Sequence, residues 1–315
     1  FAVASQVRWH GLSEDDTVVT VGGADVGGPT VGQSGPGDPR AGDLILQTED
    51  IVDAIRVHRP ALVLFGGVQY ATGQVFDMAA IARACQDCGA IFGLDLAHAV
   101  GNVPLELHAW GVDFAVFCSY KYLNSGPGGL GGIFIHEKHF DSSPRDSDSS
   151  SNIGAKLGGW WAQRIDKRFA FPIKDSFDPV QGAAGWQPSN PPSLLLAALH
   201  VALELWTEAS NVSSNNIPKD SGNKEETRSG PAMSPCDSEN GENNPLFVKS
   251  KKLTQYLEDL LVHTPGLGPD RVEVVTPAAR GAQLSLRILG TDAGTGVSMK
   301  EVYAELSTRG VVCGL

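Results

Sequence analysis

The hydrophobic positions of the first 140 residues follow two alternating spacings. Short runs of consecutive apolar residues are typical of buried strands, and the stretches between them repeat apolar residues every three to four positions, as one face of a helix does. The strand-like runs are 18–21, 61–67, 90–97, 114–119 and 132–136, and the helical stretches include 49–58 and 76–88. This alternation predicts an α/β sheet.

The later part of the chain predicts a second group of elements. Residues 193–210 predict a long buried helix, interrupted by His200 and Glu204, that is too short and too polar to span a bilayer. After it come an amphipathic helix at 247–263, strands near 272–275 and 283–288, and a last helix at 299–308. We expect these last elements to form a smaller domain.

Three segments break the pattern because they are too polar, or too rich in Gly and Pro, to bury much apolar surface. They are 22–42, the Ser/Asp tract 141–152, and 211–244. The expected organisation is a large domain over 1–209, a disordered insertion over 210–245, and part of a smaller domain over 246–315.

Composition limits the class of protein. The 315 residues are 42% hydrophobic and 19% charged, which suits a soluble globular enzyme with a large core. With 24 Lys plus Arg against 36 Asp plus Glu, the formal charge is −12, so nucleic acid and anionic membranes are disfavoured as partners. The 5 cysteines are too few and too scattered for a disulfide framework, which favours a reducing, cytoplasmic compartment.

Lys121 is the first candidate for chemistry. It follows the apolar run 114–119, lies between two tyrosines, and precedes the glycine-rich stretch 126–132. A lysine at the end of a buried strand is partly desolvated, which favours its neutral, nucleophilic form over the charged form. A strand-end lysine that only reaches for water is the commoner case when it stands alone. The glycine-rich stretch lacks the Gly-Lys-Ser/Thr ending of a phosphate loop, so it predicts close backbone packing behind Lys121.

Asp95 and His98 end the preceding strand-like run, 90–97. In a parallel sheet the ligand crevice lies beyond the carboxyl ends of the strands, so these side chains and Lys121 are expected to converge. Pyridoxal phosphate needs such a pair, a lysine for its aldehyde and a carboxylate for its pyridinium nitrogen. Taken singly, Asp95 is equally typical of a helix N-cap or turn, and His98 of a structural histidine.

Several motifs occur in the order in which they occur in kynureninases, and the chain resembles that family over nearly its whole length. The motifs are Asp95-Leu-Ala-His-Ala-Val-Gly-Asn102, Trp110-Gly-Val-Asp-Phe114, Ser119-Tyr-Lys-Tyr-Leu-Asn124, His136-Glu-Lys-His139, Gly159-Trp160, Ser189-Asn-Pro-Pro192, Arg280-Gly281 with Gln283-Leu284, and Arg309-Gly-Val-Val-Cys313.

The resemblance implies a fold-type-I pyridoxal phosphate enzyme, with a mostly parallel sheet flanked by helices and part of a smaller α+β C-terminal domain. The implied enzyme is a homodimeric, cytoplasmic hydrolase. It cleaves L-kynurenine or 3-hydroxy-L-kynurenine into an anthranilate and L-alanine, in tryptophan catabolism and NAD biosynthesis.

The resemblance also implies roles for six residues of this chain. Lys121 matches the family's Schiff-base lysine and Asp95 the partner of the pyridinium nitrogen. Tyr120 and His98 match further cofactor contacts, and Tyr120 is also the candidate for proton handling near the substrate carbonyl. The remaining two, Trp160 and Asn190, match residues that reach the cofactor or substrate across a dimer interface.

The chain also departs from the family pattern. It begins at Phe1 without methionine and ends at Leu315, so it resembles a fragment that lacks the family's N-terminal phosphate loop, its ring-stacking aromatic and its substrate-binding arginine. Gly66 stands where the family strand ends in a serine near the cofactor. We therefore expect residues 1–315 alone to turn over little substrate.

Two other interpretations stay open. One is a different enzyme of the same cofactor superfamily, such as a cysteine desulfurase-like protein using Cys313, although 309–313 predicts a helix end followed by a strand rather than a mobile loop. The other is a non-catalytic fragment or a degenerate paralogue, for which Gly66 and the two missing ends argue. The isolated pair Cys85 and Cys88 lacks a second pair at zinc spacing and is more typical of chance than of a redox or metal site.

Overall fold

The computed structural model of the chain describes residues 1–22, 30–31, 45–140, 157–169, 177–212, 243–269, 271–289 and 299–313. Most of the three compositionally unusual segments, namely 23–29, 32–42, 141–152 and 213–242, lies outside the described residues. The expected insertion at 210–245 and the division into domains therefore stay predictions.

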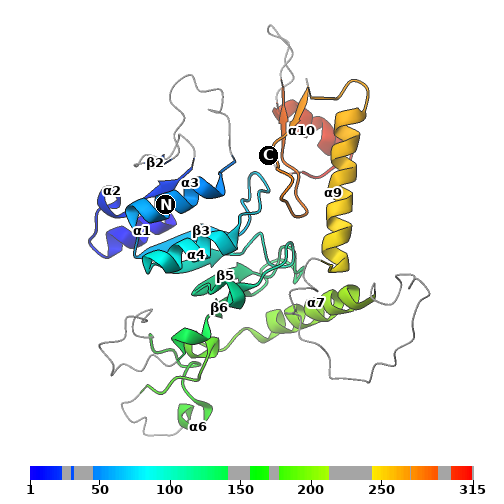
Figure 1. Ribbon diagram of the computed structural model, residues 1–315. Helices are drawn as coiled ribbons and strands as arrows, with labels where there is room; N and C mark the ends of the chain where they lie inside the picture. The colour runs from blue at the N-terminus through cyan, green and yellow to red at the C-terminus, as the bar shows by residue number, and fades with distance from the viewer. Residues whose placement is uncertain are drawn as a thin grey trace, which may run out of the picture.

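A four-stranded sheet lies at the centre of the described chain (Figure 1). Its strands are β3 (Leu62–Gly66), β4 (Ile91–Asp95), β5 (Phe114–Cys118) and β6 (Gly131–Ile135), in that spatial order. The first three run parallel and β6 runs antiparallel to β5. Each corresponds to a run of apolar residues, so the predicted α/β sheet is confirmed.

Two helices cover the inner face of this sheet, namely α3 (Thr48–His58) and α4 (Met78–Cys88). The Asp77 side chain caps the start of α4 by accepting a hydrogen bond of 2.8 Å from the Ala80 amide, and Gly89 ends the helix with a φ of 72°. The core between helices and strands is apolar, and its most buried members are Ile51, Ile81, Cys85, Phe92, Leu94, Leu96, Val112 and Ala115. Burial raises the pKa of the Cys85 thiol to about 12, which keeps this cysteine protonated at neutral pH.

Close packing explains the glycine in the middle of β4. Gly93 pairs with Leu64 on one side and with Phe114 on the other. A methyl group at position 93 would lie 2.2 Å from the Phe114 ring, so only glycine leaves room for that ring against the strand.

The outer face of the sheet is apolar but exposed within the described chain. Leu62, Leu64, Val116 and Ile133 share this face and are each more than two-fifths exposed. Parallel sheets are usually covered on both faces, so this surface is typical of one that packs against another element or chain.

The helix predicted at 193–210 is present as α7 (Ser193–Val212), but the prediction that it is buried was wrong. Among its described side chains only Ala202 is buried. Its described packing partner is α9 (Pro245–His263), where Trp206 meets Phe247 with ring centroids 6.0 Å apart. An apolar sequence indicates a preference for burial, but burial also needs a neighbouring surface, and α9 covers only a small part of α7.

The C-terminal elements gather apart from α3 and α4, as the yellow to red colours of Figure 1 show. After α9 come β7 (Val272–Val274), its antiparallel partner β8 (Leu286–Ile288), and α10 (Met299–Thr308). These match the predicted elements. The strand predicted after the last helix was wrong, because 311–313 is exposed and pairs with no described strand.

The remaining elements are short. They are α1 (Ala2–Trp9), α2 (Glu14–Thr17), β1 (Thr20–Val21), β2 (Thr30–Val31), α5 (Leu107–Trp110), η1 (Glu137–His139), α6 (Ile165–Arg168) and η2 (Ala183–Trp186). None of the helices in the described part of the chain combines the length and apolar character that a membrane crossing requires.

Asp113 anchors the sheet at the end opposite to the predicted site. Its carboxylate accepts hydrogen bonds of 2.7 Å from the Phe92 amide and from His139, and Lys138 lies 2.7 Å away. Burial by itself would raise the pKa of Asp113, but the hydrogen bonds from Lys138, Phe92 and His139 outweigh it and leave the pKa below its ordinary value. The carboxylate therefore ties β4, β5 and the turn after β6 together.

Replacing Asp113 with asparagine is expected to destabilise the fold by about 1 to 3 kcal/mol, because it removes the charge that three buried or half-buried donors share. Urea unfolding followed by circular dichroism measures the change. The matched control is Asp166→Asn, which removes an exposed carboxylate paired with Arg164 and should leave the unfolding midpoint unchanged. Equal midpoints for wild type and Asp113→Asn would contradict this role.

Candidate active site

The site begins at the carboxyl end of β4. Asp95 is the last residue of the strand, and its carboxylate accepts a hydrogen bond of 2.9 Å from the Ala97 amide, which starts a tight turn. The carboxylate is exposed, and within the described ranges it takes part in no ion pair. Gly66 lies beside it in register on β3, where a methyl group would lie 3.6 Å from the Val68 carbonyl oxygen, an ordinary van der Waals distance.

The carboxyl end of β5 presents Lys121 from a pinned loop. Ser119 is fully buried, and its hydroxyl lies 2.6 Å from both the Ser125 hydroxyl and the Leu130 carbonyl oxygen. A methyl group at Gly129 would lie 2.2 Å from the Ser125 oxygen. The predicted close packing of the glycine-rich stretch behind Lys121 is therefore confirmed at Gly129.

His98 and Lys121 meet directly. The Lys121 Nζ lies 2.9 Å from the His98 Nε2, so the ends of β4 and β5 converge as the sequence predicts. While Lys121 is protonated its ammonium can only donate, which makes Nε2 the acceptor and assigns the ring hydrogen to Nδ1. That Nδ1 is buried and has no hydrogen-bond partner among the described residues.

Two effects hold the His98 imidazole neutral. Burial lowers its pKa most, and the positive charge of Lys121 lowers it further, while the Asp95 carboxylate partly opposes both. A neutral imidazole beside the amine can accept a hydrogen bond from it without adding a second positive charge.

Three tyrosines surround this pair. The exposed Tyr120 has its ring centroid 6.0 Å from the Lys121 Nζ, and a hydrogen bond with the Cys118 side chain raises the pKa of its phenol. The rings of Tyr70 and Tyr122 lie 6.2 Å and 6.4 Å from that of His98. Tyr70 has no sequence signal for this position, because it comes from the loop after β3.

The C-terminal part of the chain also reaches the site. Asn102, at the end of the turn that carries His98, accepts a hydrogen bond of 2.8 Å from the Ala282 amide. Gln283 donates to the Tyr70 carbonyl oxygen at 2.7 Å. The motif around Arg280 and Gly281 therefore lies next to the His98 turn, a contact that sequence spacing does not reveal.

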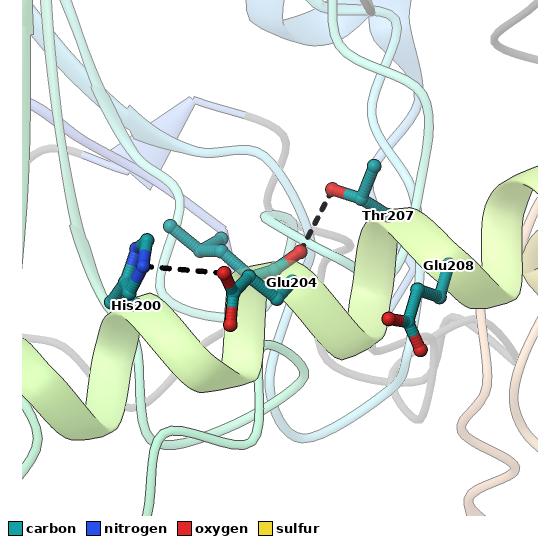
Figure 2. A pocket seen from close by; sticks show the side chains of 5 residues that line it. His200, Glu204, Thr207 and Glu208 are labelled. Carbon is teal, nitrogen blue, oxygen red and sulfur yellow. Dashed lines mark hydrogen bonds and ion pairs between the residues drawn. The ribbon is translucent and has the colours of Figure 1, made fainter.

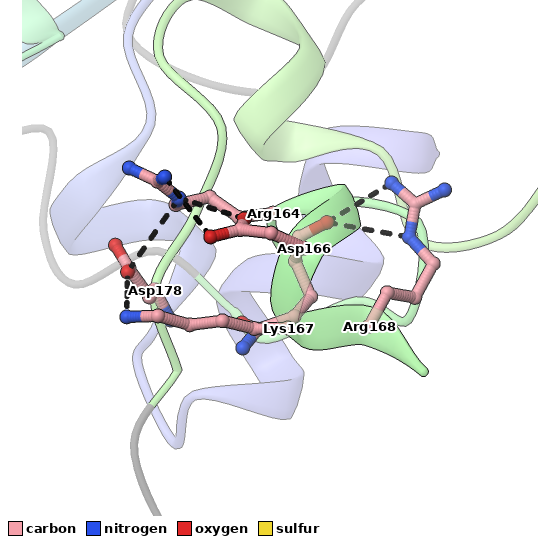
Figure 3. A network of polar contacts seen from close by, with 6 residues as sticks. Arg164, Asp166, Lys167, Arg168 and Asp178 are labelled. Carbon is pink, nitrogen blue, oxygen red and sulfur yellow. Dashed lines mark hydrogen bonds and ion pairs between the residues drawn. The ribbon is translucent and has the colours of Figure 1, made fainter. Parts of the chain in front are cut away.

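A network of charged side chains fastens the segment that carries Trp160 (Figure 3). Arg164 lies 3.9 Å from Asp178, and Lys167 contacts the same carboxylate. Main-chain hydrogen bonds join the two stretches as well, from the Arg164 amide to the Asp178 oxygen and from the Val180 amide to Ala162. The segment is therefore held by its own contacts.

Trp160 and Asn190 are not brought to the other predicted site residues. The Trp160 ring is 43% exposed and packs against Phe169, with centroids 5.9 Å apart. Asn190 is exposed, and its side-chain oxygen accepts a hydrogen bond of 3.2 Å from Ser189. Neither has a described contact with His98 or Lys121.

A hollow on α7 lies apart from these residues. It is lined by His200, Leu203, Glu204, Thr207 and Glu208, which follow one face of the helix (Figure 2). His200 lies 3.3 Å from Glu204, a pairing typical of neighbouring helical turns. None of the predicted site residues lines it.

The lowered pKa of His98 predicts how stability depends on pH. The unfolded chain binds the proton at the ordinary imidazole pKa of about 6.5, whereas folded His98 binds it only at lower pH, so stability falls as pH drops below about 6.5. In urea unfolding measured from about pH 7.5 down to about pH 5.5, the free energy of unfolding should depend less on pH in His98→Gln than in wild type.

His136, whose pKa is also lowered by burial and then by Lys138, contributes in the same direction and keeps part of the effect. The control is His263→Gln, at an exposed position on α9. An unchanged pH dependence in His98→Gln would show that the imidazole is not held neutral by the fold.

The sequence of the chain is similar to those of known proteins. Residues 41–153 match the family model for class-V aminotransferases. Over 99% of its length the chain is 37% identical to kynureninase from Myxococcus xanthus (strain DK1622), of which it covers 58%. The chain spans between 54% and 61% of the length of curated relatives of this kind.

Solved structures agree on the fold. An alanine–glyoxylate aminotransferase from Nostoc sp. matches with a TM-score of 0.53 and 18% identity, over 93% of this chain and 64% of that one. A cysteine desulfurase from Thermococcus onnurineus matches with a TM-score of 0.52 and 16% identity, over 85% and 52%. These likenesses concern the fold alone, and they confirm the expected fold type I. With the sequence matches, they show that the chain has the class-V aminotransferase fold and is similar to kynureninases over nearly its whole length.

Proposed function

We propose that the protein containing this chain is a pyridoxal phosphate-dependent kynureninase. It would hydrolyse the Cβ–Cγ bond of L-kynurenine or 3-hydroxy-L-kynurenine, giving an anthranilate and L-alanine. The observation that supports this most is the 2.9 Å contact of Lys121 with His98 beside Asp95, at adjacent strand ends of a chain 37% identical to a kynureninase.

The residues at the strand ends fit this cofactor. The donor set contains an amine, a carboxylate in no described ion pair, and an imidazole whose buried Nδ1 lacks a described partner. Such a set suits a ligand that carries an aldehyde, a basic ring nitrogen and further polar groups. Lys121, Asp95, His98 and Tyr120 would hold it, and when bound it supplies an electron sink next to the substrate Cα.

The side chains of the chain have distinct tasks in this proposal. The Lys121 amine would remove the Cα proton and return it later, a role typically worth roughly 10² to 10⁴ in rate. Water adds to the γ-carbonyl carbon, and breaking the Cβ–Cγ bond then leaves the carboxylate on anthranilate. Tyr120, exposed beside Lys121, would exchange a proton at the carbonyl oxygen.

We further propose a homodimer in which Trp160 and Asn190 serve the site of a second copy. Both are exposed, and neither has a described contact with Lys121. The exposed apolar side chains of α7 and of the outer sheet face offer surface for such an assembly. We also propose a cytoplasmic location, and the proposed reaction would place the protein in tryptophan breakdown and NAD synthesis.

The desulfurase alternative is less well supported. Cys313 is exposed after α10 and has no described contact with Lys121 or His98. The likeness to a desulfurase stands at 16% identity, against 37% for a kynureninase. The degenerate alternative rests on Gly66, although a Cβ at this position would make only an ordinary contact of 3.6 Å with the Val68 carbonyl oxygen.

Cofactor labelling tests the proposed lysine. Borohydride reduction after adding pyridoxal phosphate, followed by peptide mass mapping, should place one cofactor per chain on Lys121, because its amine is the one held beside Asp95 and His98. Lys121→Ala should lose this label, while Lys251→Ala, at an exposed position on α9, should keep it. Labelling scattered over surface lysines would contradict a formed site.

The reaction itself is tested on the complete protein with saturating pyridoxal phosphate. Anthranilate fluorescence should rise when kynurenine is added, and Lys121→Ala should slow this by roughly 10² to 10⁴, because no positioned base remains. Lys251→Ala serves again as the control. A complete protein that forms the Lys121 adduct yet releases no anthranilate would refute the proposed reaction while leaving the cofactor site intact.

A further inference from the structure

Asn102 connects the His98 turn to a distant part of the chain. Asn102 lies four positions after His98 and is only 4% exposed. The Nδ2 donates to the His98 carbonyl oxygen at 2.9 Å, and the Oδ1 accepts from the Ala282 amide at 2.8 Å. Both ends of the amide are therefore used, each in the one direction that its chemistry allows.

The partner segment is shaped for this contact. A methyl group on Gly281 would lie 2.2 Å from the Asn102 Oδ1, so the backbone can approach the amide only because residue 281 is glycine. The neighbouring Arg280 is buried. It forms an ion pair with Glu258 and donates a hydrogen bond to the Gln255 side chain, and both partners lie on α9. The segment is thus fixed on the side away from Asn102.

The same segment also holds the other side of His98. Gln283 and Ser285 donate to the carbonyl oxygens of Tyr70 and Ala71, at 2.7 Å and 2.6 Å. The Tyr70 ring lies 6.2 Å from that of His98. The C-terminal segment therefore holds both the Tyr70 loop beside the imidazole and, through Asn102, the turn that carries His98.

We propose that Asn102 is a positioning residue that, through its contact with Ala282, fixes the His98 imidazole against the Lys121 amine. Asn102 has no described contact with the Lys121 amine, and it acts through the backbone of His98. The C-terminal part of the chain therefore sets the geometry of the lysine. The inference rests on the proposed function only for its meaning in catalysis, because the contact itself involves this chain alone.

The first test needs no cofactor. NMR titration of the His98 imidazole in the 315-residue chain should give a higher midpoint in Asn102→Ala than in wild type, because a released imidazole returns toward its ordinary value. Asn102→Leu, which has the same branched shape and adds no charge but loses both hydrogen bonds, should shift it in the same direction and covers the case in which Asn102→Ala does not fold.

A matched control separates positioning from general loss of stability. Asp113→Asn weakens the opposite end of the sheet and should leave the His98 midpoint at the wild-type value, even where its unfolding midpoint falls as far as that of the Asn102 variants. A His98 midpoint that stays unchanged in the folded Asn102 variants would overturn the proposal.

The second test uses pyridoxal phosphate as the probe. Absorbance titration should show about two- to tenfold weaker binding to Asn102→Leu, the effect of about one misplaced hydrogen bond, with a shifted pH midpoint of the bound chromophore. A wild-type chain that binds no pyridoxal phosphate would count against the proposed function, whereas the NMR midpoint would still decide the role of Asn102.

Discussion

The parallel pairing of β4 with β5 is the constraint on which the rest of the site depends. It aligns Asp95 with Val116, so the chain leaving β4 and the chain leaving β5 emerge at the same edge. The imidazole of His98 and the amine of Lys121 meet there only because both strands stop within a few residues of that line. Asp113 secures the opposite edge by binding the Phe92 amide across the same pair of strands.

The electrostatic character of the site follows from what Lys121 lacks as well as from what it contacts. Its described partner is a neutral imidazole rather than a carboxylate, and Asp95 takes part in no ion pair among the described residues. A carboxylate in direct contact would favour the charged amine and compete with any incoming ligand. The arrangement keeps the amine and the acid near each other but available for separate partners.

The sequence predicted most of this framework, since long apolar runs specify both the strands and the edge where their polar ends meet. It did not predict the contacts of Tyr70 and Asn102, because these join loops to residues about 180 to 210 positions away and leave no periodic pattern. The burial of α7 was predicted wrongly because an apolar composition indicates only that a helix favours burial, whereas the neighbouring elements determine whether its side chains are buried. The roles proposed for Trp160 and Asn190 would involve a second copy, which a single chain does not contain.

The exposed outer face of the sheet has a consequence for how the chain behaves in solution. Leu62 and Leu64 lie on an edge strand, and with Val116 and Ile133 they form an adhesive apolar surface on a molecule whose formal charge is −12. Mutual repulsion between like-charged chains keeps such surfaces apart at low ionic strength, and its range shrinks to about 10 Å at 0.1 M salt. Electrostatic repulsion is therefore expected to contribute to the colloidal stability of the chain, and added salt would favour its self-association.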